Sequence, residues 1–341
     1  MRYRLFGNTG VWVSQISLGT MTFGDALDPL HSGLGALDQQ GVDRMVDRAL
    51  DVGINFIDTA DSYGKGRSEE LLGRALRRRR DDVVLATKVH SRTGPGPNDA
   101  GWSRLHVTRA LEASLRRLKT DHIDLYQLHN FDNLTPFEEV LWALDDAVQQ
   151  GKIRYFGSAT LAAWQITKGL GASALHDLHR LISVQAHYSL VRLDVERDLG
   201  PMAQSEKLAL TVWSPLAGGF LTGGFLTGRF NWDGPLNCPA RRSGRAGFHP
   251  VKPEPGFKVV EMLRTVATRH DASIPQVAIA WLLARPTVTS VVIDARTMDQ
   301  LDDSIAASGV TLTEQDLADL DAVSAQPPAH PNRLQQMYAA R

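Results

Sequence analysis

Eight short apolar runs, separated by longer segments with helical periodicity, limit the architectures open to this chain. The runs occupy residues 15–18, 54–57, 83–87, 123–128, 153–156, 181–185, 208–213 and 288–293. They are rich in Val and Ile, as strands buried on both faces of a parallel sheet usually are. Strands that alternate with helices along a whole chain form parallel sheets, and eight of them favour a closed (β/α)8 barrel over an open sheet.

Helical patterns fill the intervals between these runs. They cover residues 40–52, 68–77, 106–118, 136–150, 162–170, 196–206, 256–269 and 298–307, and further helices are expected at 274–284 and 313–323. Two short runs at residues 3–6 and 11–13 flank a glycine-containing turn and predict a β-hairpin. The chain contains no G-x-G-x-x-G, the usual signature of an open dinucleotide-binding sheet. We therefore predict an α/β protein, a single (β/α)8 TIM barrel over residues 1–341 with an N-terminal β-hairpin and extra C-terminal helices.

Composition narrows the classes of partner. The 341 residues hold 37 Lys and Arg against 38 Asp and Glu, and a single cysteine, Cys238. The balanced charge argues against a nucleic-acid partner, and the lone cysteine excludes an intramolecular disulfide and a cysteine-cluster metal site. The N-terminus lacks the apolar segment of a secretory signal, and no apolar run reaches the length of a membrane span. We expect a cytoplasmic protein with a small-molecule substrate, with no bound metal and no membrane partner; the composition selects no oligomeric state.

Three segments are long for simple connections, namely residues 19–39, 89–104 and 214–255. Connections between elements of a compact domain usually have a few residues, and longer ones often carry function. In a barrel, loops that follow strands cover the C-terminal face, where active sites lie. We expect the active site beneath these loops.

Four chemically active side chains follow three consecutive predicted strands. Asp58 follows the second run, Tyr63 comes five residues later, Lys88 ends the third run and His129 follows the fourth. Each alone has a structural explanation, as a turn cap, a surface lysine or a core histidine. Together they are expected to converge, because the carboxyl ends of barrel strands meet at one face.

These four side chains make a proton donor for a carbonyl group. A free tyrosine has a pKa near 10, and a neighbouring Lys88 ammonium is expected to lower it by favouring the phenolate. Asp58 would keep Lys88 charged and in place, while His129 would orient the substrate oxygen. Tyr63 would then protonate the alkoxide that forms as a hydride arrives. No side chain supplies a hydride, so this chemistry implies a nicotinamide cofactor.

The chain resembles the aldo-keto reductase family. The motifs that carry the resemblance lie between residues 7 and 324; they are Gly19–Gly24 (GTMTFG), Gly53–Gly64 (GINFIDTADSYG), Ala86–Lys88 (ATK), Asp124–His129 (DLYQLH), Gly151–Gly157 (GKIRYFG) and Trp213–Gly219 (WSPLAGG). The resemblance implies a barrel that binds NADPH and reduces aldehydes or ketones, with NADH not excluded. It also implies that Tyr63 is the general acid and that Lys88, Asp58 and His129 are its partners.

The resemblance further implies a set of cofactor-binding positions. Thr20 and Met21 match positions beside the nicotinamide, Gln185 matches a carboxamide contact, and Trp213 matches the aromatic residue that stacks on the nicotinamide. Ser214, Leu216 and Gly218 match positions in the family's pyrophosphate-binding loop. Arg296 matches the basic residue near the adenosine 2′-phosphate. Ser158, Thr160, Gln300 and Ser304 complete the set.

Several of these positions depart from the family pattern. The Ser and Asn that hold the carboxamide are replaced by Ala159 and Thr160, and a carboxylate, Asp294, replaces the Gly before the phosphate-binding Arg. Ser304 replaces the Asn that contacts the adenine. A Thr hydroxyl keeps at most part of the two-ended contact that an amide makes. These departures suggest the hypothesis that the chain binds the nicotinamide more weakly or in an altered way, while its four catalytic residues are intact.

The loops suggest a substrate class and leave two alternatives. Phe23, His90, Trp102, Asn130 and Phe131 are candidate lining residues, and their aromatic character suggests a moderately bulky, partly apolar carbonyl compound or a keto-sugar. The first alternative is a cofactor-sensing regulatory or binding protein with little turnover, as the potassium-channel β-subunits of this superfamily are. The second is a cofactor-dependent dehydratase or isomerase without net reduction.

Overall fold

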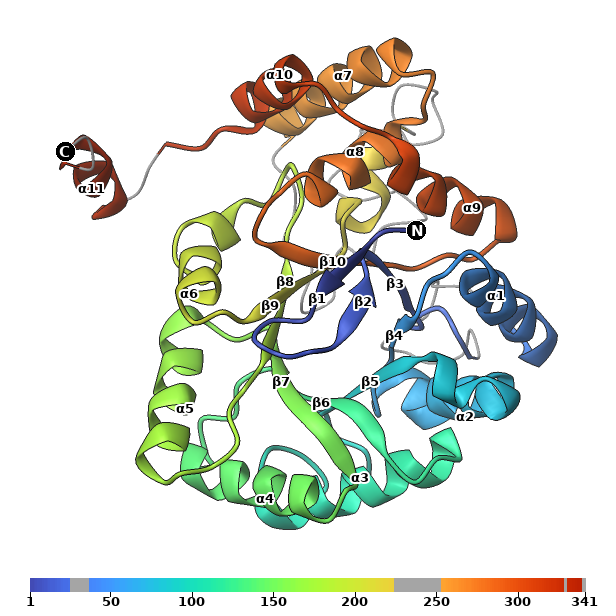
Figure 1. Cartoon of the computed structure of the whole chain (residues 1–341), viewed down its shortest axis with the longest axis vertical. Helices are drawn as coiled ribbons and strands as arrows, with labels where there is room; N and C mark the ends of the chain where they lie inside the picture. The colour runs from blue at the N-terminus through green and yellow to red at the C-terminus, as the bar shows by residue number, and fades with distance from the viewer. Residues whose placement is uncertain (25–36, 224–252, 328–329, 339–341) are drawn as a thin grey trace.

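The computed structural model of the chain is a closed barrel of eight parallel strands (Figure 1). It describes residues 1–24, 37–223, 253–327 and 330–338. The strands follow one another around the barrel in the order β10-β3-β4-β5-β6-β7-β8-β9. Their bounds are β3 Ile16–Gly19, β4 Phe56–Asp58, β5 Val84–Val89, β6 Ile123–His129, β7 Ile153–Ala159, β8 Ser183–His187, β9 Ala209–Trp213 and β10 Val288–Ile293.

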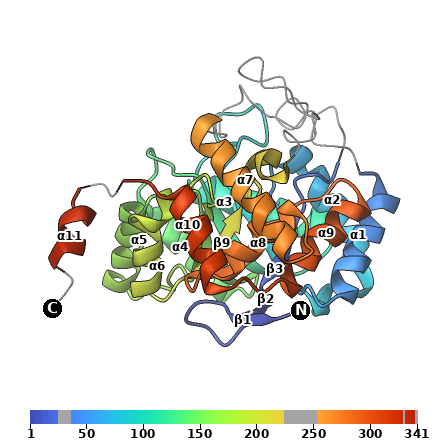
Figure 2. The same cartoon turned by 90° about the horizontal axis from the view of Figure 1, so that it is seen from above.

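Helices surround the barrel and bury one apolar face against it. Their bounds are α1 Gln39–Asp51, α2 Arg67–Ala75, α3 Arg104–Leu118, α4 Phe137–Gln149, α5 Ala163–Leu175, α6 Leu199–Ser205, α7 Pro253–Arg269, α8 Ile274–Leu283, α9 Met298–Ala306, α10 Glu314–Ser324 and α11 Asn332–Tyr338. In both views α11 stands apart from the ring of helices (Figures 1 and 2). Within the described residues, no helix combines the length and the apolar character needed to cross a bilayer.

The predicted (β/α)8 architecture is confirmed, with differences at element ends. Each apolar run overlaps one barrel strand, but β4 and β7 extend further toward their carboxyl ends than predicted, because polar residues there still pair with neighbouring strands. The helix predicted at 196–206 is instead a short 3-10 turn at Asp194–Glu196 followed by α6. Pro201 explains the late start, because proline is tolerated only in the first turn of a helix. Helix α11 has no counterpart in the predictions.

The predicted N-terminal hairpin closes one end of the barrel (Figure 2). Its strands, β1 Tyr3–Leu5 and β2 Trp12–Ser14, pair in antiparallel fashion. Phe6 and Val13 are buried in a small apolar cluster with Phe56, and the two phenyl rings meet edge to face at 5.4 Å. Burying such aromatic rings stabilises the closed end by roughly 2 kcal/mol each. The hairpin thus seals the barrel from below with apolar side chains.

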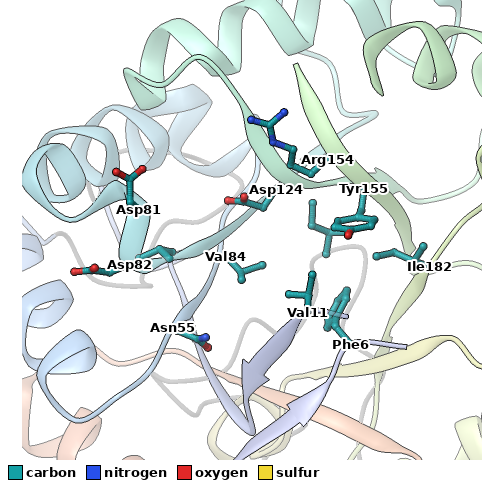
Figure 3. A pocket seen from close by; sticks show the side chains of 12 residues that line it. Phe6, Val11, Asn55, Asp81, Asp82, Val84, Asp124, Arg154, Tyr155 and Ile182 are labelled. Atoms are coloured by element: carbon teal, nitrogen blue, oxygen red, sulfur yellow. The ribbon is translucent and has the colours of Figure 1, made fainter. Parts of the chain in front are cut away.

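A cavity of about 410 Å³ lies beside this hairpin (Figure 3). It is bordered by Phe6 and Val11 of the hairpin and by residues at the beginnings of strands, such as Asn55, Asp124 and Tyr155. None of the predicted site residues lines it. The predicted chemistry therefore belongs to the opposite end of the barrel, above the carboxyl ends of the strands. The predicted loops 19–39 and 214–255 lie only partly within the described ranges, and Cys238 lies outside them.

Candidate active site

The predicted catalytic residues lie together at the carboxyl ends of neighbouring strands. Asp58 is the last residue of β4, Lys88 is the second last of β5, and His129 is the last of β6. Strands β4, β5 and β6 are consecutive neighbours in the barrel. Tyr63 begins the short 3-10 turn that follows β4.

Lys88 and Asp58 form a buried ion pair. The Lys88 Nζ donates to Asp58 Oδ2 at 2.5 Å and to the Thr59 carbonyl at 2.8 Å. Lys88 is fully buried and Asp58 is 2% exposed. A buried charge is tolerated only when it is paired and hydrogen-bonded, and this ammonium has three oxygen partners once Tyr63 is included.

Tyr63 provides the third partner of that ammonium. Its hydroxyl lies 3.3 Å from Lys88 Nζ, and its ring meets the His129 ring edge to face at 6.4 Å. The turn that presents it contains Gly64 and Gly66 with φ of 55° and 92°, a left-handed conformation that glycine adopts without steric cost. The D-x4-Y spacing is therefore a strand end followed by a tight turn that returns the phenol over the lysine.

The expectation that the pKa of Tyr63 is lowered is wrong in its net direction. Burial raises the pKa of the Tyr63 phenol, and this effect exceeds the lowering due to Lys88; Asp58 and Asp294 raise it further. For Lys88, burial lowers the pKa, but Asp58 and Tyr63 together outweigh burial and the pKa is raised. The pair therefore stays as a neutral phenol beside an ammonium, so Tyr63 holds the proton that a donor needs.

Two buried glutamines hold the other oxygen of Asp58. Gln127 Nε2 donates to Asp58 Oδ1 at 2.8 Å, and Gln185 Nε2 donates to the same atom at 3.0 Å. Sequence reasoning missed Gln127, although a glutamine inside an apolar strand two residues before His129 was a detectable signal. For Gln185 the resemblance implied a carboxamide contact, but its amide nitrogen bonds to the Asp58 carboxylate here.

Thr20, Met21 and Ser158 lie around this centre on neighbouring strand ends. Thr20 is buried, and its hydroxyl donates to the Asp58 carbonyl at 3.2 Å. The backbone N–H of Met21 donates to Asp294 Oδ1 at 3.1 Å. Asp294 thus fastens the first strand-end loop to the last one. Ser158 is buried and donates to the Ser183 carbonyl at 3.4 Å.

The segment after β9 has the backbone of an anion-binding loop. Ser214, Ala217, Gly218 and Gly219 all have positive φ, between 50° and 94°. The Gly218 N–H donates to Ser214 Oγ at 3.1 Å, and Leu216 lies partly buried between them. Successive N–H groups in such a conformation form concave sites for phosphate oxygens. Here the N–H groups of Ala217, Gly218 and Gly219 bond to Ser214 and Leu216 within the loop, so the pyrophosphate role of the loop stays a prediction.

Trp213 precedes that loop at the end of β9 and is stacked on His187. The ring centroids lie 4.3 Å apart with an interplanar angle of 20°. Sequence reasoning missed His187, which ends β8 two residues after Gln185. Both side chains are partly exposed. A flat aromatic surface thus lies at the carboxyl end of the barrel, at the position predicted for nicotinamide stacking.

The positions that depart from the family pattern show local differences. Ala159 is buried and offers no polar side-chain atom, while the neighbouring Thr160 is exposed with φ of 65°. A β-branched residue is strained in this left-handed region, where asparagine is better tolerated. Arg296 is partly exposed and its backbone N–H donates to Gln300 Oε1 at 2.9 Å, whereas Ser304 is buried on α9.

The candidate substrate residues divide by exposure. Trp102 and Phe23 are buried, so they support the walls of the site from behind. His90, Asn130 and Phe131 are partly exposed, and Phe131 packs edge to face on Trp102 at 5.4 Å. Burial lowers the pKa of the His90 imidazole, which keeps it neutral. Those three exposed side chains remain candidates for substrate contact.

The described residues fit a nicotinamide dinucleotide at its phosphates and its ring. The loop after β9 has the left-handed backbone typical of phosphate sites, Arg296 supplies a permanent cation, and Trp213 supplies a stacking surface. The carboxamide end is poorer in donors, because Ala159 is apolar and the Gln185 amide is bonded to Asp58. The site therefore fits the cofactor class with an altered carboxamide contact.

Comparison with known proteins identifies the family. The model of the Aldo/keto reductase family matches residues 15–325. An uncharacterized oxidoreductase, YrpG, of Bacillus subtilis (strain 168) is 36% identical over 95% of this chain and 96% of its own length. A probable voltage-gated potassium channel subunit beta of Arabidopsis thaliana is 33% identical over 91% of this chain and 92% of its own length. The versiconal hemiacetal acetate reductase of Aspergillus parasiticus is 30% identical over 97% and 99%. This chain belongs to the aldo/keto reductase family.

Proposed function

We propose that this protein reduces an aldehyde or ketone to an alcohol with NADPH, and that Tyr63 donates the proton. The observation that carries the proposal is the buried Lys88, whose ammonium bonds to Asp58 on one side and to the Tyr63 hydroxyl on the other. Membership of a family of NAD(P)H-dependent oxidoreductases supports the reaction class.

Each of the four catalytic candidates would have its own part in proton donation. Reduction of a carbonyl group places negative charge on its oxygen, and a hydroxyl within hydrogen-bonding reach neutralises that charge by giving up a proton. As Tyr63 becomes phenolate, the adjacent Lys88 ammonium stabilises it, and Asp58 keeps that ammonium in place. His129, with its ring edge to face with the Tyr63 ring, is placed to donate to the same carbonyl oxygen and orient it.

The cofactor would be held by the opposite side of the barrel and would supply the hydride. Ser214, Leu216 and Gly218 would hold the pyrophosphate, and the Trp213 ring would stack on the nicotinamide. Arg296 favours NADPH, because a guanidinium binds a 2′-phosphate through two hydrogen bonds. His90, Asn130 and Phe131 would contact a moderately bulky, partly apolar substrate.

A second candidate is a cofactor-sensing regulatory protein. It is favoured by the relative named as a potassium channel subunit beta and by the altered residues at the carboxamide end. A cofactor-dependent isomerase or dehydratase would use the same proton donor. It is distinguished from a reductase because it forms product without a net loss of reduced cofactor.

One assay separates these functions. Purified protein is incubated with NADPH or NADH and with aromatic aldehydes, aliphatic ketones and keto-sugars, and both reduced cofactor and product are quantified. The proposal predicts one alcohol formed per NADPH consumed. Product formed without loss of NADPH would identify the isomerase or dehydratase, and tight NADPH binding with no product across the panel would identify the regulatory protein.

A further inference from the structure

The catalytic carboxylate lies inside a ring of donors that spans the barrel. Strands β4 and β8 are opposite one another in the eight-strand order, with β6 halfway between them. Asp58, Gln127 and Gln185 come from these three alternating strands. Side chains from alternate strands of such a barrel form one layer of its interior, usually of branched apolar residues. Here at least three members of a layer are polar and hydrogen-bonded to one another.

All members of this layer are buried. Gln127 and Lys88 are fully buried, and Asp58 and Gln185 are 2% and 3% exposed. The carboxylate is therefore shielded from water, and three side chains of the barrel, Lys88, Gln127 and Gln185, donate to it. A buried carboxylate oxygen without a donor is costly, so both oxygens need partners. Lys88 satisfies Oδ2, and the two amides satisfy Oδ1.

This division of the two oxygens fixes the orientation of the carboxylate. With Oδ1 held by amide donors from β6 and β8, Oδ2 can point only toward Lys88 on β5. Strands β5 and β6 place Lys88 and Gln127 directly opposite each other in register. The amides carry no charge, so they hold Oδ1 without competing with Lys88 for the negative charge.

We propose that Gln127, together with Gln185, is a positioning residue for proton donation: it holds the Asp58 carboxylate directed at Lys88, and through Asp58 it keeps the Lys88 ammonium beside the Tyr63 hydroxyl. The proposal rests on the proposed function, since it concerns the same proton donor. Beyond the layer, the ionisable groups that face Tyr63 and Lys88 include His129 at the end of β6, Asp294 after β10 and Asp61 after β4.

Two substitutions of Gln127 have different expected effects on the pH profile of kcat/KM. Gln127→Met keeps the volume and removes the donor, so the Asp58 carboxylate loses one of the two amides that orient it, and kcat/KM falls by about tenfold at every pH while the Kd for NADPH stays unchanged. Gln127→Glu donates to Asp58 while the introduced carboxyl group is protonated and repels it once ionised. The kcat/KM of this variant is therefore closest to the wild-type value at acid pH. It falls below the wild-type value as pH rises and the introduced carboxyl group ionises.

The matched control is Gln15→Met. Gln15 is also a buried glutamine, 1% exposed, and within the described residues its amide nitrogen has no hydrogen-bond partner. Its substitution measures the effect of replacing a buried amide without touching Asp58. We expect its pH profile to match that of the wild type. Thermal unfolding of all variants reports whether each one folds, and Gln127→Glu alone carries the test if Gln127→Met does not fold.

The assay uses NADPH and the aldehyde or ketone that the wild type reduces fastest, with Tyr63→Phe alongside. A loss of kcat/KM at every pH for Gln127→Met, a loss that grows with pH for Gln127→Glu, and a wild-type profile for Gln15→Met support the positioning role. Superimposable profiles for all four folded proteins, with Tyr63→Phe inactive, overturn this inference and leave the proposed function intact. An active Tyr63→Phe instead overturns the proton-donor assignment itself.

Discussion

The two halves of the active site differ in how their polar groups are satisfied. On the β4–β6 side, Asp58 and Lys88 are buried, and their hydrogen bonds connect neighbouring strands. On the β7–β10 side, the chain has an apolar Ala159, a left-handed Thr160 and an exposed Asp294. The first half carries the hydrogen-bonded groups proposed for proton transfer, whereas the second carries the left-handed loop proposed for phosphate and has fewer donors for the nicotinamide amide.

The largest effect is expected from breaking the ion pair of the first half. Lys88→Met leaves Asp58 as a buried charge without its counterion, which costs about 3–5 kcal/mol of the free energy of unfolding. Reduction of carbonyl compounds falls by roughly a thousandfold because Tyr63 loses the charge that stabilises its phenolate. Urea unfolding and kcat/KM measure the two effects.

The double variant Lys88→Met/Asp58→Asn is the control. It removes both charges, so most of the lost stability returns while activity does not. A double variant no more stable than Lys88→Met would contradict the ion-pair explanation.

Asp61 gives the next largest effect, on stability. Burial, reinforced by Glu69, raises the pKa of Asp61 to about 8. Between pH 4 and pH 8 the folded chain therefore keeps a proton that the unfolded chain releases, so stability falls as pH rises. The expected loss is about 4 kcal/mol by pH 7. Asp61→Asn should remove this dependence, so the two proteins are equally stable near pH 4 and diverge above it. Parallel stability curves from pH 4 to pH 7 would refute the shifted pKa.

The second half is tested by restoring the family residues. Ala159→Ser/Thr160→Asn adds an amide and a hydroxyl at the carboxamide end and relieves the left-handed Thr160. We expect the Kd for NADPH, measured by calorimetry, to fall by about tenfold. Asp177→Asn, at another left-handed position with φ of 52° outside the site, is the control and should leave the Kd unchanged. An unchanged Kd in the double variant would show that the departures do not weaken binding.

Asp294 gives the smallest effect. Asp294→Asn keeps an acceptor for the Met21 N–H and removes a negative charge from the side where the phosphates are expected. Because Asp294 is exposed, its repulsion is worth at most about 1 kcal/mol, so the Kd for NADPH should fall about threefold at low salt. The difference should disappear at high ionic strength. A difference that is independent of salt would point to a structural change instead.

The barrel was predictable because it depends on periodicity. Apolar runs such as 123–128 and 288–293 correspond closely to β6 and β10, since strands buried on both faces must be apolar. Helix ends were less predictable: the 3-10 turn before α6 depends on local backbone geometry around Pro201. Helix α11 has little burial, so no apolar periodicity marks it.

The convergence of Asp58, Tyr63, Lys88 and His129 was also predictable, because strand ends share one face. The partners of Asp58 and the net pKa shift of Tyr63 were not. Gln185 reaches Asp58 across the barrel interior, a contact that depends on side-chain direction, and the pKa of Tyr63 depends on how completely the turn buries it. Sequence spacing specifies neither quantity.

Tyr63 is the proposed proton donor of a carbonyl reductase. The most direct measurement compares kcat/KM and the Kd for NADPH of wild type and Tyr63→Phe, using the carbonyl compound that the wild type reduces fastest. We expect Tyr63→Phe to lose about 10²–10⁴-fold in kcat/KM while its Kd for NADPH stays within about twofold of the wild-type value. A Tyr63→Phe protein that binds NADPH and retains kcat/KM within about threefold would contradict it.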